Sequence, residues 1–378
     1  MKKRKIVFLT GTRADFGKLK SLIKISQNDE HFEVNIFATG MHLNKKYGLT
    51  VEEISKSGFK DIFKFINHDS GNEMDKILSK TIDGFSNYLR EFDPDLIVVH
   101  GDRIEALAGA IVGSLNNVLV AHIEGGELSG TIDELIRHAI SKLSHIHLVS
   151  NEIAKKRLIQ LGEYPDSIHI IGSPDLDLMK SNTLPKVDDV KKYYNIPFIN
   201  YAIAILHPVT TEFDLLENQI SVFTESLIES SLNYVIIYPN NDLGSEKILF
   251  GYKNLIGNDK IKIFPSIRFE SFLSLLKNAE FMIGNSSTGI REAPFYNIPT
   301  IDIGTRQKNR YSSETIFNVN FSKNEILHKI NEVMGKEKLS SKYKDTFGLG
   351  NSDKSFLKLI KKKNFWSTSH QKQFQDMT

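Results

Sequence analysis

Short apolar runs rich in valine and isoleucine alternate with longer amphipathic segments along most of the 378 residues. Strands buried on both faces of a sheet read as continuous apolar runs, and this alternation favours parallel sheets covered by helices on both faces. In the first half the pattern predicts strands at Lys5–Thr10, Val34–Ala38, Leu96–His100, Val118–His122, His145–Val149 and Ile168–Ile171. Helices are predicted between them at Gly17–Ile25, Met74–Phe92, Ile104–Leu115, Ile132–Leu143 and Asn151–Leu161.

The alternation stops after Gly172-Ser173-Pro174 and begins again at Ala202. The polar stretch between them, with Asn182 and Pro185, is a candidate linker. We therefore expect an α/β chain of two Rossmann-like domains that face each other across a cleft. The expected boundaries are 1–178 for the first domain, 179–353 for the second, and 354–378 for a C-terminal helix and a frayed tail.

The composition excludes several classes of protein. The chain has no cysteine, which excludes disulfides, thiolate metal sites and cysteine nucleophiles. Its net charge is only +2, with both signs interspersed, so we expect no nucleic-acid partner. No apolar stretch approaches membrane-spanning length, and we expect a cytoplasmic protein without membrane contact. No cluster of His and Asp has metal-ligand spacing, and we give little weight to Asp175-Leu176-Asp177 as a metal motif.

Polar residues gather where predicted strands end. The first strand runs into Gly11-Thr12-Arg13, a turn that resembles a P-loop but has Leu19 where Mg²⁺ would need a Ser or Thr. What remains is an arginine and backbone N–H groups that an anion can bind. The alternative is a helix N-cap followed by a surface arginine, and taken alone this alternative is favoured.

Two further strands end in acids. Asp102 and Arg103 follow one strand, and Glu124 follows the next. Burying such groups is costly unless they face a polar cavity. Asp102 has the alternative role of capping the helix that opens at Ile104. Glu124 has no such alternative, because two glycines follow it.

Asp133 and Glu134 lie in the first turn of a predicted helix. Acids are favourable there, and this structural role accounts for one of the two. The other acid is then available to point into the cleft. Arg137 lies four residues after Asp133 and could pair with it.

In the second half His207 precedes a proline at a strand end, which presents an imidazole that is easily poised near neutral pH. The segment Gly284–Glu292 offers Ser286, Ser287 and their N–H groups to a phosphate, and Glu292 to a ribose. A capping box would explain one serine and the acid, but not three adjacent hydroxyl residues. A helix is predicted at Ile290–Tyr296, after the glycine-rich turn. Arg306 ends the following strand as a further phosphate-facing arginine.

Together these motifs resemble the UDP-N-acetylglucosamine 2-epimerase family, and within it the hydrolysing, sialic-acid-type branch. The resemblance covers nearly the whole chain and is carried by GTRADFGKL, HGDRIEALA, HIEGGELSGTIDELIRHAISKLSH, LHPVTT, IGNSSTGIREA and IDIGTRQ.

The resemblance implies a glycosyltransferase-B-like fold, a C-terminal helix that crosses back to the first domain, and a homodimer or homotetramer that needs no cofactor. It implies that UDP is held largely by the second domain, and that His42 lies at a family cleft position. The catalytic candidates that it implies are Asp102, Glu124, Asp133 and His207; the UDP contacts are Arg13, Arg103, Ser286, Ser287, Glu292 and Arg306.

The implied reaction converts UDP-N-acetylglucosamine and water to N-acetylmannosamine and UDP. Three other activities stay open: the same chemistry on UDP-2,4-diacetamido-2,4,6-trideoxyglucose, a non-hydrolysing 2-epimerase, and a glycosyltransferase of the same fold. A non-enzymatic nucleotide-sugar sensor is disfavoured, because three acids in a cleft would then be a cost without a purpose.

Overall fold

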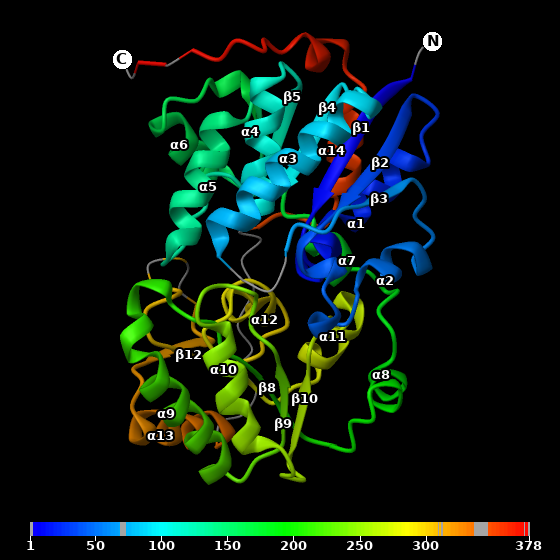
Figure 1. Ribbon diagram of the computed structural model, residues 1–378. Coiled ribbons are helices and arrows are strands. Elements are labelled where there is room, and N and C mark those ends of the chain that lie inside the picture. Colours follow the sequence, from blue (N-terminus) through cyan, green and yellow to red (C-terminus); the bar gives the residue numbers. More distant parts are fainter. Residues whose placement is uncertain are drawn as a thin grey trace. The chain divides into compact units, whose positions relative to one another are not determined.

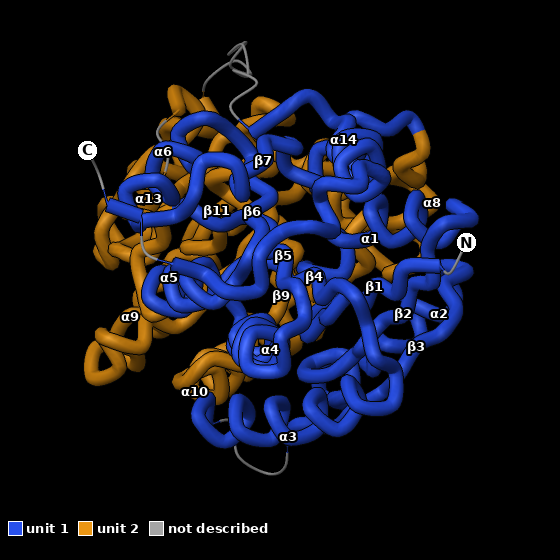
Figure 2. The backbone as a smooth tube through the Cα atoms, turned by 90° about the horizontal axis from the view of Figure 1, so that it is seen from above, with its two compact units in different colours: residues 1–127, 133–182, 345–378 blue, residues 128–132, 183–344 orange. Residues whose placement is uncertain are grey.

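The computed structural model describes residues 3–68, 73–308, 310, 313–335, 347–373 and 375–376. The chain forms two compact units (Figure 2). Unit 1 contains residues 1–127, 133–182 and 345–378, and unit 2 contains residues 128–132 and 183–344. Each unit has a parallel sheet with helices packed against it (Figure 1), which confirms the predicted two-domain α/β class.

The sheet of unit 1 has seven strands in the described part of the chain, in the order β3-β2-β1-β4-β5-β6-β7. All neighbouring strands are parallel. The strands are β1 (Arg4–Thr10), β2 (Phe32–Ala38), β3 (Ile62–Lys64), β4 (Leu96–His100), β5 (Leu119–Ile123), β6 (Ile146–Val149) and β7 (Ile168–Ile170).

Alternate strand residues point to opposite faces of the sheet, so both faces of this sheet are apolar. Helices pack on both faces and bury these side chains. Phe8 packs edge-on against Phe356 of the C-terminal helix on one face. On the other face, Leu9 and Val99 come close to Gly109. The α-helices of unit 1 are α1 (Arg13–Gln27), α2 (Val51–Lys56), α3 (Met74–Phe92), α4 (Ile104–Leu115), α5 (Ile132–Leu143), α6 (Glu152–Gln160), α7 (Asp175–Met179) and α14 (Ser352–Ile360).

Unit 2 repeats the design with six described strands in the order β10-β9-β8-β11-β12-β13, again all parallel. The strands are β8 (Ala202–Ile205), β9 (Tyr234–Ile237), β10 (Ile261–Phe264), β11 (Met282–Gly284), β12 (Thr300–Ile303) and β13 (Ile316–Val319). The α-helices are α8 (Val187–Tyr193), α9 (Leu216–Glu229), α10 (Ser245–Gly251), α11 (Phe269–Lys277), α12 (Glu292–Phe295) and α13 (Lys323–Met334).

The strand orders fix where a ligand can bind. In each unit the order reverses beside the first strand of the sheet, between β1 and β4 in unit 1 and between β8 and β11 in unit 2. Open parallel sheets bind ligands beyond the carboxyl ends of the strands at this point. The polar residues identified from the sequence follow these strands and their neighbours, so each unit presents its candidates at its own binding edge.

Some details differ from the sequence expectation. The edge strands β3 and β13 were not predicted, because they are short and only partly buried. The helix expected at Ile290–Tyr296 is only the four-residue α12.

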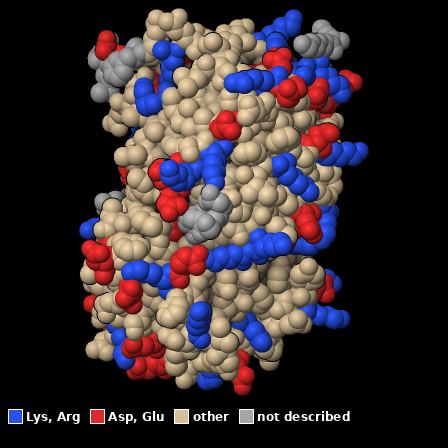
Figure 3. Space-filling model, viewed as in Figure 1, with Lys and Arg blue, Asp and Glu red and all other residues tan. Residues whose placement is uncertain are grey.

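On the face drawn in Figure 3, positive and negative side chains are interspersed. None of the helices in the described ranges is long and apolar enough to cross a membrane.

Candidate active site

The carboxylate of Glu124 is the centre of the polar cluster in unit 1. Glu124 directly follows β5 and is 5% exposed. Lys18 Nζ donates to its Oε1 at 3.4 Å, Ser173 Oγ donates to the same oxygen at 3.3 Å, and His100 Nε2 lies 3.3 Å from it. Lys18 Nζ also lies 3.9 Å from Asp175. The buried carboxylate thus has a lysine, a histidine and a hydroxyl as neighbours, drawn from three different segments.

The backbone of Glu124 has φ of 66°. This left-handed conformation is uncommon for a residue with a side chain and costs roughly 1–2 kcal/mol. Arg137 Nη1 donates to the Glu124 carbonyl at 2.9 Å, which helps to hold this turn. Strained residues of this kind cluster at functional sites, and the observation supports a functional role for the acid.

Arg137 also joins Glu124 to Asp102. Its Nη2 donates to Asp102 Oδ2, and its side chain is 2% exposed. A buried guanidinium with a fork of donors can position a carboxylate and a carbonyl together. The N-cap of α4 is Arg103 and not Asp102, and the side chain of Arg103 makes no capping hydrogen bond. Arg137 was noticed in the sequence only as a possible partner of Asp133, because its spacing from Asp102 carries no signal.

His122 supports the turn that carries Gly101 and Asp102. Its Nε2 is 2.7 Å from the Gly101 carbonyl, and its Nδ1 is 3.0 Å from Ser141 Oγ. Burial lowers the pKa of His122 to about 3, although the bond to Gly101 opposes this. The ring is therefore neutral at pH 7. A carbonyl can only accept, so Nε2 carries the proton and Nδ1 accepts from Ser141.

The turn after β1 is held by a capping box. Thr12 caps α1, and the Asp15 carboxylate accepts from the N–H groups of Gly11 and Thr12 at 2.9 Å each. Arg13 forms an ion pair with Glu53, and its side chain is only 14% exposed. The structure thus contains the predicted cap, but the arginine beside it is not on an open surface.

His42 lies behind this turn, fully buried between two threonines. Its Nε2 is 3.0 Å from Thr10 Oγ1 and its Nδ1 is 2.7 Å from Thr50 Oγ1. Burial lowers its pKa to about 4, against the charge of Asp15. The imidazole is therefore neutral at pH 7 and braces the loop that carries Arg13. A direct contact of His42 with substrate stays a prediction.

Two other candidates stand at the starts of helices. Arg103 Nε lies 3.7 Å from Glu105 Oε2, and Glu105 is 1% exposed. Asp133 lies in the first turn of α5 and is partly buried. Arg137 lies one turn further along α5, so Asp133 and the arginine that pairs with Asp102 are both in the first half of this helix.

In unit 2 the side chain of Asn285 links β8 to β11 at the binding edge. Its Oδ1 accepts from His207 N at 2.6 Å, and its Nδ2 donates to His207 O at 2.8 Å. The His207 ring Nδ1 accepts from Asn240 N at 3.2 Å. In the neutral ring the proton therefore sits on Nε2, which His207 can offer as a donor.

The segment after Asn285 is the predicted phosphate turn. Ser286 caps a short 3₁₀ helix, Ser287–Gly289, by accepting from Thr288 N at 3.3 Å. Glu292 is 2% exposed and begins the separate helix α12, so the capping-box alternative is wrong. With so short a helix the dipole contributes little. An anion at this turn would therefore be bound by the N–H groups and hydroxyls rather than by a helix dipole.

The loop after β12 packs on the same turn. Gln307 Nε2 donates to Asn285 O at 2.8 Å, and Arg306 Nη1 lies 3.4 Å from that carbonyl. Asp302 is buried within β12, and burial raises its pKa to about 7 against the charges of Arg306 and Arg310. The sequence candidates of unit 2, which are His207, Ser286, Ser287, Glu292 and Arg306, thus follow β8, β11 and β12, and Asn285 bonds both His207 and Arg306. Their contact with UDP stays a prediction.

Asp302 makes the stability of unit 2 depend on pH. Its pKa is about 7 when folded and near 3.8 when unfolded, so its stabilising contribution is present below pH 3.8 and is lost as the pH rises through 7. The full loss is about 4 kcal/mol. We expect Asp302→Asn to raise Tm by more at pH 8 than at pH 5, measured by thermal unfolding. The exposed Asp259→Asn is the control; an equal rise at both pH values would contradict the assignment.

Among the residues that the structure describes, no group of three or more His, Asp and Glu side chains could hold a metal ion. The Asp175-Leu176-Asp177 triplet has a structural use. Asp177 accepts from the N–H groups of Ser352 and Asp353 at 2.8 and 3.0 Å, and so caps α14. Asp175 approaches Lys18 as described above.

Known proteins are similar to this chain in sequence. The profile of the UDP-N-acetylglucosamine 2-epimerase family matches residues 24–361. A Neisseria meningitidis serogroup B protein named UDP-N-acetylglucosamine 2-epimerase is 48% identical over 379 residues, which is 99% of each chain. A Legionella pneumophila protein named UDP-N,N'-diacetylbacillosamine 2-epimerase (hydrolyzing) is 35% identical over 95% of this chain and 96% of its own. A Campylobacter jejuni GDP/UDP-N,N'-diacetylbacillosamine 2-epimerase (hydrolyzing) is 37% identical over 84% of each.

Solved structures share the fold. The Methanocaldococcus jannaschii UDP-GlcNAc 2-epimerase, crystallised with UDP-GlcNAc and UDP, superposes with a TM-score of 0.77 at 20% identity, over 94% of this chain and 99% of that one. A Neisseria meningitidis UDP-GlcNAc 2-epimerase bound to UDP-GlcNAc gives 0.75 at 18% identity, with the same coverage. The fold is therefore glycosyltransferase-B-like, as predicted. With the family profile and the close relative, these findings show that the chain belongs to the UDP-N-acetylglucosamine 2-epimerase family of nucleotide-sugar 2-epimerases.

Proposed function

We propose that this chain is a hydrolysing 2-epimerase that converts UDP-N-acetylglucosamine and water to N-acetylmannosamine and UDP, the first step toward a sialic acid. The observation that carries the proposal is the buried carboxylate of Glu124, held in a left-handed turn beside Asp102 by one arginine. An acid kept in such a turn is suited to proton transfer. Relatives at 35% and 37% identity are named hydrolysing 2-epimerases, which supports the hydrolytic outcome.

The chemistry explains why the acids need a leaving group. The C2 proton of the sugar has no adjacent carbonyl, and a carboxylate with a pKa near ~4 does not remove it from the resting substrate. The C1–O bond therefore breaks first and its electron pair leaves with UDP. Positive charge at C1 then acidifies C2–H, and a carboxylate takes that proton to give a glycal.

Rehydration completes the reaction. Water adds its oxygen at C1 and gives up one proton to an ionised carboxylate. An acid on the opposite face donates a proton to C2, which inverts that carbon. Two opposed faces require at least two acid–base groups. We assign this work to Asp102, Glu124 and Asp133 together, with His207 as a further donor. The protonated Nε2 of His207 suits it to hydrogen-bond a departing phosphate oxygen or a sugar hydroxyl.

UDP is assigned to the turn of unit 2. The N–H groups and hydroxyls of Ser286 and Ser287 would bind the diphosphate, and Glu292 would accept from the ribose hydroxyls. The guanidinium groups of Arg13 and Arg306 would stabilise charge on the leaving diphosphate. Arg103 is the remaining residue that we assign to UDP binding.

We expect the enzyme to act as a homo-oligomer. Leu115, which is 77% exposed on α4, is a candidate interface residue.

One experiment tests the function. The protein is incubated with UDP-N-acetylglucosamine in deuterated water, and the products are identified by NMR. We expect free N-acetylmannosamine with deuterium at C2, together with UDP. A 2-epimer still attached to UDP would establish the non-hydrolysing reaction instead. Inertness on this substrate with turnover of UDP-N,N'-diacetylbacillosamine, the sugar in the names of two relatives, would keep the chemistry and change the sugar.

The phosphate assignment has its own test. Ser287 is partly buried, and its hydroxyl is not the capping group of the turn, which is Ser286. A hydrogen bond to a charged phosphate is worth about 1.5–3 kcal/mol. We therefore expect Ser287→Ala to weaken UDP binding about tenfold or more, measured by titration calorimetry. Ser221→Ala on α9 is the control, and unchanged affinity of the Ser287 variant would refute the assignment.

A further inference from the structure

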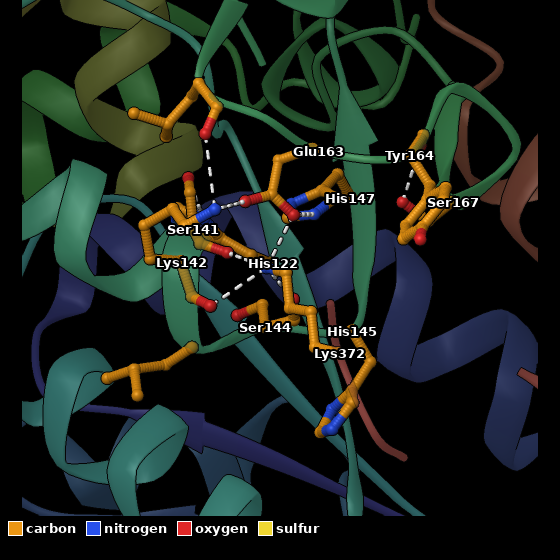
Figure 4. Close-up of polar contacts among 12 residues, drawn as sticks. His122, Ser141, Lys142, Ser144, His145, His147, Glu163, Tyr164, Ser167 and Lys372 are labelled. Atoms are coloured by element: carbon orange, nitrogen blue, oxygen red, sulfur yellow. Dashed lines mark hydrogen bonds and ion pairs between the residues drawn. The ribbon is translucent and has the colours of Figure 1, made fainter. Parts of the chain in front are cut away.

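A buried cluster of charged side chains gathers around Glu163 and Lys142 (Figure 4). Lys142 lies in the last turn of α5, whereas Asp133 and Glu134 lie in its first turn. At the centre of the cluster is Glu163, whose side chain has no exposed surface. Glu163 Oε2 accepts from His147 Nε2 at 2.9 Å, and Lys142 Nζ lies 2.9 Å from Oε1. Burial would raise the pKa of Glu163, but the hydrogen bond from His147 and the charge of Lys372 lower it to about 2. This buried carboxylate is therefore ionised and requires a cation.

The second cation comes from the far end of the chain. Lys372 Nζ lies 2.5 Å from Glu163 Oε2 and is bonded to three carbonyls at the end of α5, those of Ser141 and Lys142 at 2.9 Å and that of Ser144 at 2.7 Å. The last carbonyls of a helix have no partner within the helix. One ammonium from the C-terminal tail thus satisfies the end of α5 and the buried acid together (Figure 4).

A second contact holds the tail in the same place. His145 follows α5 and begins the approach to β6; its Nε2 is 3.1 Å from the carbonyl of His370. Its Nδ1 accepts from Val120 N at 3.1 Å, so Nε2 carries the proton and donates to His370. The rings of His145 and His370 also meet edge to face, with centroids 6.0 Å apart. Residues 370–372 are therefore docked by two independent anchors.

Helix α5 connects this anchor to the acids. Ser141, whose carbonyl accepts from Lys372, also bonds the ring of His122 through its hydroxyl, and His122 donates to Gly101 O beside Asp102. One turn earlier, Arg137 bonds Asp102 and the Glu124 carbonyl. Movement of α5 along its axis would therefore shift both supports of Asp102.

We propose that Lys372 is a positioning residue for the acid site: by clamping the end of α5, the C-terminal tail sets the place of Asp102 and Glu124. The inference rests on the proposed function, because it assigns these acids to turnover. It predicts an effect on the chemical step rather than on UDP, since the tail and α5 lie in unit 1, whereas the Ser286–Glu292 segment assigned to the nucleotide lies in unit 2.

The test uses full-length variants. A misplacement of about 1 Å can cost a hundredfold in rate. We expect Lys372→Ala to lower kcat about ten- to a hundredfold with KM and UDP affinity within about twofold of wild type. Amide hydrogen exchange should accelerate in residues 136–143 without a matching fall in Tm. Lys372→Arg, which keeps the charge and the donors, should restore most of the turnover. The exposed Lys363→Ala in the same tail is the matched control.

The outcomes separate the two claims. If wild type turns over no UDP-sugar, the proposed function fails, and the exchange comparison alone decides whether the tail clamps α5. If wild type is active and Lys372→Ala matches Lys363→Ala in kcat and in exchange of α5, the clamp is refuted. A lower kcat in Lys372→Ala that comes with a lower Tm and with faster amide exchange throughout the chain would also overturn the clamp. That pattern would indicate general destabilisation.

Discussion

Replacing Glu124 by glutamine is expected to lower kcat by about two to four orders of magnitude while UDP affinity stays near its wild-type value. Glutamine keeps the size of the side chain and can still accept from Ser173, but an amide cannot take a proton from C2. UDP affinity is retained because Glu124 is not among the assigned UDP contacts, and most of those contacts belong to unit 2, whereas Glu124 belongs to unit 1.

The measurement is release of UDP in single-turnover experiments, together with calorimetric titration of UDP. Glu134→Gln is the matched control, since Glu134 lies in the same region, is partly exposed and pairs with His138 at 3.3 Å. Turnover near wild type in Glu124→Gln would remove this acid from the mechanism. An equal loss in Glu134→Gln would place the proton transfer at the start of α5 instead.

The left-handed turn explains why the acid at this position is informative. A glycine at position 124 would relieve the backbone cost, yet the chain carries a glutamate there, supported by Arg137. The neighbouring glycines, by contrast, have no side chain to present. The strain is therefore consistent with selection for the carboxylate rather than for the turn alone.

The sequence predicted most of the fold because the central strands are buried on both faces. The strand Leu96–His100 and the helix Ile104–Leu115 were predicted to the residue. The edge strand Ile62–Lys64 is three residues long with two of them exposed, so it lacks the continuous apolar run that marks a buried strand. The helix after the phosphate turn was predicted too long, mainly at its start, because Ile290 ends the 3₁₀ helix Ser287–Gly289 and Arg291 is the N-cap of α12.

Some residues of the candidate site could be predicted from the sequence and others could not. A rule about strand ends was enough to select Asp102, Glu124 and His207, because the ends of parallel strands meet at one edge of a sheet. Their partners could not be selected, since each partner depends on tertiary packing. Arg137 is 35 residues from Asp102, and Lys372 is 231 residues from the Ser141 carbonyl that it contacts. No periodicity connects residues so far apart, and the cap on α5 is visible only in the fold.

Replacing Gly284 by alanine is expected to be the most damaging single change in unit 2. Gly284 has φ of 131°, and a Cβ there would lie 1.9 Å from the carbonyl oxygen of Ile205 and 2.7 Å from its carbon. Gly284 pairs with Ile205 across β11 and β8, the two strands beside the binding edge. A contact with backbone cannot be relieved by a rotamer change, so the strands must separate. We expect a loss of about 3 kcal/mol or more in unfolding free energy.

The separation should also reach the nucleotide site. Asn285 follows Gly284 and bonds both backbone groups of His207, and its carbonyl accepts from Gln307. The control is Gly257→Ala, where φ is 90° but no atom lies within 4 Å of the added Cβ. That variant bears only the conformational cost of about 1–2 kcal/mol. Thermal unfolding and UDP calorimetry on both variants separate clash from conformation: Gly284→Ala should lose UDP binding and Gly257→Ala should keep it. If both variants were equally destabilised and both bound UDP normally, β8 and β11 would have separated without disturbing the phosphate turn. The close approach of these two strands would then not determine the conformation of that turn.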